Sequence, residues 1–188
     1  MAVKMVKTVW LINEYGTVPE NGYGGRIFYL AKNLSEMGFT VYFIVARNHH
    51  LLNFGLSNPK SKVVDGVNVI SINSLNYSRS TSVKRILNWF YFAFKLLGIG
   101  HKLSQKPDVI IYSSPSLIGY LSAYRLAKKY HAKLFFEVRD IWPLTPIFMP
   151  FPTHKIQTIV LATRASYNCT GTIVPVHRTI VCICIQII

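Results

Sequence analysis

The chain of 188 residues is long enough to bury one hydrophobic core, so one domain is the default expectation. Hydrophobic residues make up 51% of it, which excludes a disordered chain. Lysine and arginine number 21 against 7 aspartates and glutamates, and this net charge of +14 indicates an anionic partner: a phosphorylated substrate, a nucleic acid or an acidic membrane surface.

A glycine-rich loop follows the first hydrophobic run. Residues 6–12 predict a buried strand, residues 13–25 a long loop, and residues 26–38 a helix with one apolar face. Glycines that open a helix let its first N–H groups approach a phosphate, and Arg26 adds a guanidinium that suits phosphate or carboxylate. A plain turn capped by glycine is the alternative. Ile27 stands where a dinucleotide fingerprint needs its third glycine, which disfavours a dehydrogenase.

The next segments continue a strand–helix alternation. Residues 39–46 are apolar throughout, as in a strand of a parallel sheet that is covered on both faces. Residues 47–62 are polar and irregular, and we expect an exposed loop there rather than a metal or catalytic site at His49 and His50. Asp65 and Gly66 predict a turn before a strand over residues 67–72.

Residues 82–102 predict a helix that is apolar almost all round. Two interpretations stay open: a helix buried in the layer that covers the sheet, or an interfacial helix whose aromatic side chains enter lipid while its basic side chains meet phosphate headgroups. The residues expected to contact the membrane are Lys84, Arg85, Trp89, Phe90 and Phe94.

Polar residues follow the last two predicted strands, residues 107–112 and 131–138. Ser114 lies at the carboxyl end of the first, where ligands bind in open α/β sheets, and Ser116 is expected to cap a helix over residues 117–130. The alternation predicts an α/β fold, a Rossmann-like parallel sheet with helices on both faces.

Three charged residues, Glu137, Arg139 and Asp140, gather where the strand over residues 131–138 ends. They form either a local ion pair that fixes the turn or the edge of an active site. We favour the active site, because the strand–loop–helix order brings this edge toward the glycine loop.

Two separated motifs carry a family resemblance. Gly-Tyr-Gly-Gly-Arg at residues 22–26 and Phe-Glu-Val-Arg-Asp-Ile-Trp-Pro at residues 136–143 together resemble the N-terminal half of family 4 glycosyltransferases, in particular their WbuB-like branch. The resemblance implies a single N-terminal GT-B domain and a retaining transfer of a hexosyl or N-acetylhexosaminyl group. The donor would be a nucleotide-sugar, expected to be UDP-linked, and the acceptor a lipid-linked one in cell-surface polysaccharide or lipopolysaccharide synthesis. The implied location is cytoplasmic, peripheral at the inner face of the cell membrane.

The resemblance also implies roles for individual residues. Gly24 and Gly25, with Arg26, would lie against the diphosphate of the donor. Many family members have His-Asp where this chain has Arg139 and Asp140.

Asp140 would accordingly be a catalytic or substrate-orienting carboxylate and Arg139 a stabiliser of charge. Glu137 would bind substrate or hold Arg139 in place. No cofactor beyond the donor, no metal and no nucleic acid are expected.

The chain divides at residue 147 in this interpretation. Residues 1–147 form the acceptor-side Rossmann-like domain, and residues 148–188 form an atypical tail, acid-free and carrying all three cysteines, that resembles a frame-shifted or truncated end. The second domain that a GT-B enzyme needs is not recognisable, so we expect the chain to be inactive alone. The alternative is a non-catalytic basic α/β module that binds anionic membrane or nucleic acid.

Overall fold

The computed structural model describes residues 7–22, 24–53, 55–75, 83–113, 116–138, 172–176 and 181–186. Within them, eight strands form one sheet in the order β3-β4-β2-β1-β5-β6-β8-β7. The strands are β1 (Thr8–Ile12), β2 (Thr40–Ala46), β3 (Ser61–Val64), β4 (Val67–Ile72), β5 (Val109–Ser113), β6 (Lys133–Val138), β7 (Thr172–Val176) and β8 (Val181–Gln186). The helices are α1 (Gly25–Glu36), α2 (Val83–Leu97), the short η1 (Ile99–His101) and α3 (Leu117–Tyr130).

Five parallel strands make the centre of the sheet. β1 pairs in parallel with both β2 and β5, and β4 and β6 extend the parallel set on either side. The order β4-β2-β1-β5-β6 is that of a doubly wound sheet, in which the direction of winding reverses between β1 and β5. The prediction of a Rossmann-like α/β fold is therefore confirmed.

Antiparallel strands flank this centre. β3 and β4 form a hairpin through the predicted turn at Asp65 and Gly66. At the other side, β8 pairs antiparallel with β6, and β7 with β8. Parts of the expected tail thus lie in the same sheet as residues 7–138, while its boundary at residue 147 stays a prediction.

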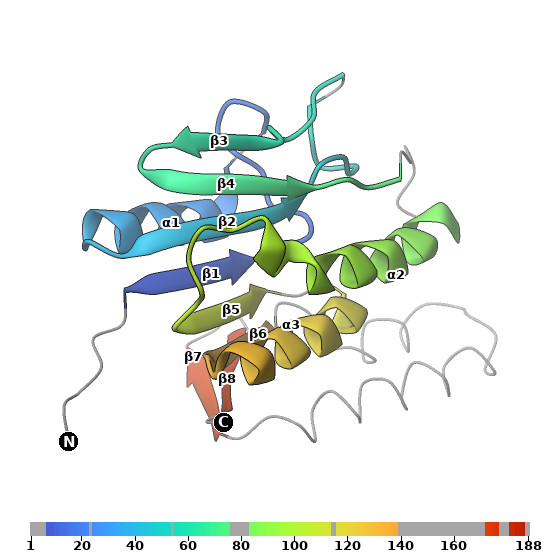
Figure 1. Ribbon diagram of the computed structural model, residues 1–188. Coiled ribbons are helices and arrows are strands. Elements are labelled where there is room, and N and C mark those ends of the chain that lie inside the picture. Colours follow the sequence, from blue (N-terminus) through green and yellow to red (C-terminus); the bar gives the residue numbers. More distant parts are fainter. Residues whose placement is uncertain are drawn as a thin grey trace, which may run out of the picture.

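The sheet is the middle of three layers (Figure 1). α2 and α3 lie side by side on one face and share a core with alternate residues of the central strands, Trp10, Ile12, Tyr112 and Phe136 among them. α1 covers the opposite face, where Phe28 packs with Leu11, Phe43 and Val69. β2 is apolar throughout because its alternate residues enter these two cores.

Candidate functional site

Two glycines open α1 at the carboxyl edge of the sheet. Gly24 has φ 65° and Gly25 has φ 69°, a left-handed conformation that other residues adopt only with strain. No described side chain caps this helix start, and a Cβ at Gly25 would meet no atom within 4 Å. The first N–H groups of α1 and the positive end of its dipole are thus open to an anion.

Arg26 links this helix start to the end of β6. Its guanidinium donates to Oε1 of Glu137 across 111 residues of sequence. The Arg26 side chain is 57% exposed and that of Glu137 only 7%, so the pair joins a surface cation to a buried carboxylate. The structure therefore brings two predicted site residues together, while the expected contact of Glu137 with Arg139 stays a prediction because Arg139 lies outside the described residues.

Three predicted site residues, Ser114, Arg139 and Asp140, lie outside the described residues, so their roles stay predictions. The neighbouring Ser116 occupies the N-cap position of α3 as expected, but its hydroxyl caps nothing in the described part of the chain. Its carbonyl instead accepts a 2.5 Å hydrogen bond from the hydroxyl of Tyr112. Burial raises the pKa of this hydroxyl well above its usual value. This bond ties the end of β5 to the start of α3.

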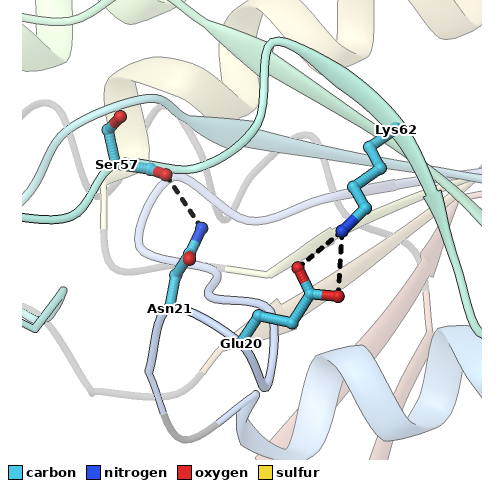
Figure 2. A network of polar contacts seen from close by, with 4 residues as sticks. All are labelled: Glu20, Asn21, Ser57 and Lys62. Atoms are coloured by element: carbon cyan, nitrogen blue, oxygen red, sulfur yellow. Dashed lines mark hydrogen bonds and ion pairs between the residues drawn. The ribbon is translucent and has the colours of Figure 1, made fainter.

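The loop that leads to the glycines is anchored at several points (Figure 2). Nζ of Lys62 donates to both carboxylate oxygens of Glu20, at 2.9 and 2.7 Å. Nδ2 of Asn21 donates to the carbonyl of Ser57 at 2.8 Å, as Figure 2 shows. β3 and the segment before it therefore hold the glycine loop over the sheet edge.

The prediction of an exposed loop after β2 is wrong at His49, because the side chain of His49 is buried. Its Nε2 lies 3.1 Å from the carbonyl of Gly16, and its Nδ1 accepts from the N–H of Leu51. Burial lowers the pKa of His49 to about 4, which fits a neutral ring with the proton on Nε2. His49 therefore anchors the glycine loop through the carbonyl of Gly16.

Glu14 is a site residue that the sequence analysis missed. It lies two residues after the end of β1, and its side chain is fully buried on the face covered by α2. Nδ2 of Asn88 on α2 approaches its Oε1 at 3.4 Å. Burial raises the pKa of Glu14 to about 8, while Arg85 and the bond from Asn88 act in the opposite direction. The sequence signal was an acid two residues after an apolar strand.

The five residues expected to contact a membrane are divided between two sides of α2. Arg85 and Trp89 turn inward, where Nε of Arg85 (3.0 Å) and Nε1 of Trp89 (2.7 Å) both donate to the hydroxyl of Tyr15. Lys84 is exposed, and Phe90 and Phe94 are exposed by 57% and 71%.

The exposed stripe of α2 comprises Ile86, Leu87, Phe90 and Phe94. On the opposite side, Phe92 and Leu96 enter the core. The inner side of α2 therefore belongs to the layer that covers the sheet, and its outer side is apolar and exposed, while its contact with a membrane stays a prediction.

The described residues contain no group of three or more His, Cys, Asp and Glu side chains arranged to hold a metal ion. Among the described helices, none combines the length and the apolar character that crossing a membrane requires.

Comparisons with known proteins give distant similarities. No family model and no curated protein matches the chain. The C-terminal domain of a hydrogenase from Pyrococcus furiosus, in two crystal structures, is 14% and 15% identical with TM-scores of 0.43 and 0.44, and each match covers 72% of this chain and 95% of that domain. The glycosyltransferase TcCGT1 in complex with UDP is 14% identical with a TM-score of 0.44. The match covers 71% of this chain and 28% of TcCGT1. Similarities this weak establish neither family nor function, and the assignment to Rossmann-like α/β domains comes from the strand order.

Proposed function

We propose that the chain is the acceptor-side domain of a GT-B glycosyltransferase of family 4, which transfers a sugar from a UDP-linked donor. The observation that carries the proposal is the start of α1, where two left-handed glycines and the exposed guanidinium of Arg26 meet at the carboxyl edge of the sheet. A diphosphate fits such a helix start because the N–H groups, the dipole and the guanidinium all favour negative charge.

Catalysis in this proposal uses the charged edge after β6. Asp140 orients or activates the acceptor, Arg139 stabilises developing negative charge, and Ser114 contributes to binding from the end of β5. In this proposal a second domain closes over the nucleotide, and sugar transfer requires it. The family resemblance of the two sequence motifs supports these roles.

The acceptor in this proposal is carried on a lipid at the inner face of a membrane. The exposed stripe of α2 supports it, because Leu87, Phe90 and Phe94 present a continuous apolar surface flanked by Lys84 and Lys95. Such a surface suits the boundary between acyl chains and anionic headgroups. α2 would then hold the sheet edge close to the lipid-linked acceptor.

A non-catalytic module that binds anionic membrane is the second candidate, favoured by the net charge of +14 together with the same stripe. It predicts salt-sensitive attachment to vesicles of phosphatidylglycerol and phosphatidylcholine with no response to nucleotide.

Titration of UDP into the isotope-labelled chain, followed by NMR, tests the donor site. We expect the amide signals of Gly25, Arg26 and Ile27 to shift most, since these N–H groups form the first turn of α1. Arg26→Ala should weaken the binding, whereas Arg125→Ala, which removes an exposed arginine on α3, should not. No shift at the start of α1, or equal weakening by both variants, would refute the donor site.

A further inference from the structure

The carboxyl groups of Glu14 and Glu137 each have one buried oxygen without a hydrogen-bond partner among the described residues, but the other oxygen of Glu137 accepts from the guanidinium of Arg26. Glu14 has no ion pair of this kind among the described residues. One oxygen has the amide of Asn88 at 3.4 Å, a long hydrogen bond, and the other is buried with no hydrogen-bond partner among the described residues. An ionised carboxylate without close donors is costly to bury, whereas a neutral carboxylic acid is much less so. The lack of close donors around the carboxyl group of Glu14 therefore favours its protonated, neutral form.

Asn88 connects this carboxyl group to α2 and to the segment after β4. Its side chain is fully buried, and its Oδ1 accepts a 2.8 Å hydrogen bond from the N–H of Leu75. The backbone of Glu14 is itself fixed, because its carbonyl accepts from the N–H of Ala46 at the end of β2. A single buried amide thus joins the end of β1, the approach to α2 and the helix itself.

Several ionisable groups face Glu14 from the elements packed against it. Arg85 lies on α2, and Tyr112 lies on β5 close enough to interact electrostatically. Tyr15 follows Glu14 directly, and its ring contacts His49 and His50 at centroid distances of 5.6 and 5.1 Å. Arg85 favours the ionised acid, and its guanidinium also lies over the rings of Tyr15 and Trp89 at 5.5 and 5.3 Å.

We propose that Glu14 is a positioning residue for α2: as a neutral acid it holds Asn88 and the first turns of the helix against the end of β1, and its ionisation, which is costly in this buried place, rearranges that contact. A new negative charge at this place attracts Arg85 away from Tyr15 and draws water into the buried site. The hydrogen bonds that hold the inner side of α2 are then exchanged.

The exposed stripe of α2 depends on this contact. Leu87 precedes Asn88 directly, and Phe90 lies two residues further on, so any movement of Asn88 carries the stripe with it. Through its contact with Asn88, Glu14 accordingly sets the position of the exposed stripe relative to the glycine loop. The proposal does not depend on sugar transfer or on lipid binding.

Amide hydrogen exchange, corrected for the intrinsic effect of pH, tests the proposal on the whole chain without any ligand. At about pH 9, one unit above the pKa of Glu14, only about a tenth of the side chain stays protonated. We expect protection of residues 83–97 to fall about tenfold between pH 6.5 and pH 9, and to fall more than the protection of α1, the internal reference.

Two variants and a control complete the experiment. Glu14→Gln keeps the shape but cannot ionise, so α2 should stay protected at both pH values. Glu14→Ala removes the contact and should lower the protection of α2 at both. Glu36→Gln, which changes an exposed glutamate on α1, should behave like the wild type. A wild type without the fall, or a Glu14→Gln variant that keeps it, would overturn the proposal.

Discussion

α1 and α2 both begin at the carboxyl edge of the sheet, on opposite faces, yet each offers something different. α1 offers its end, where an uncapped glycine start stands beside the ion pair of Arg26 and Glu137. α2 is fixed near its start by buried bonds to Glu14 and Tyr15 and offers its outer side, an apolar stripe. One edge of the sheet thus presents an uncapped helix start on one face and an exposed apolar stripe on the other.

The sharpest division within this comparison is between the two sides of α2. Phe92 is fully buried among the core residues, while Phe94 is 71% exposed. We expect Phe92→Ala to lower the free energy of unfolding by about 3–5 kcal/mol, because it leaves a cavity. Phe94→Ala should change it by less than about 0.5 kcal/mol. Urea denaturation measures both, and equal losses would mean that the outer side of α2 is covered by other parts of the chain.

Much of the fold follows from local pattern, and much of the site does not. The helix expected over residues 117–130 is α3 with the same bounds, and the strand expected over residues 67–72 is β4, because periodicity and turn residues are local signals. β3 was not expected as a strand of its own, since its four residues are mostly exposed.

The network around Glu14 could not be predicted, because its partners on α2 lie more than 70 residues further along the chain. The burial of His49 escaped for the same reason: its partner Gly16 precedes it by 33 residues and is brought to it only by the pairing of β1 with β2. Pairings that depend on the assembled sheet leave no mark in a local pattern of residues.

The pH dependence of stability tests the burial of Glu14. Its folded pKa of about 8 exceeds the ordinary 4.5, so the stability it contributes is present below pH 4.5 and is lost as the pH rises toward 8. His49 acts oppositely: its folded pKa of about 4 lies below 6.5, so its contribution is present above pH 6.5 and is lost as the pH falls toward 4. Burial lowers the pKa of His50 as well, which adds to the loss on the acid side.

The effects of Glu14 and His49 oppose each other between pH 4.5 and 6.5, and above that window Glu14 is the one of these groups whose ionisation still changes. We therefore expect the free energy of unfolding to fall by about 2 kcal/mol from pH 6.5 to pH 8. Denaturation curves of Glu14→Gln should lack this slope, and those of the control Glu36→Gln should keep it. A slope that survives in Glu14→Gln belongs to another group and would show that the burial of Glu14 does not set this pH dependence.

The hydroxyl of Tyr15 is the second attachment of α2. It accepts hydrogen bonds from both Arg85 and Trp89 in a mostly buried setting, and Tyr15→Phe removes that acceptor without changing the ring. We expect a loss of about 1–2 kcal/mol in the free energy of unfolding. Tyr29→Phe on α1 is the matched control, since that side chain is half exposed and should tolerate the change. Equal effects of the two variants would show that the shared hydroxyl does not hold α2.

The smallest effect is expected at the attachment of α1. A double-mutant cycle with Arg26→Ala and Glu137→Gln should give a coupling energy of about 1 kcal/mol, because the carboxylate is buried but most of the guanidinium is in water. The same cycle on Lys62 and Glu20, a pair exposed on both sides, should give less than about 0.5 kcal/mol. A coupling at Arg26 no larger than that at Lys62 would mean that the burial of Glu137 adds nothing to the pair. The guanidinium would then turn to an arriving phosphate at little cost, and the start of α1 would be a stronger anion site than the ion pair suggests.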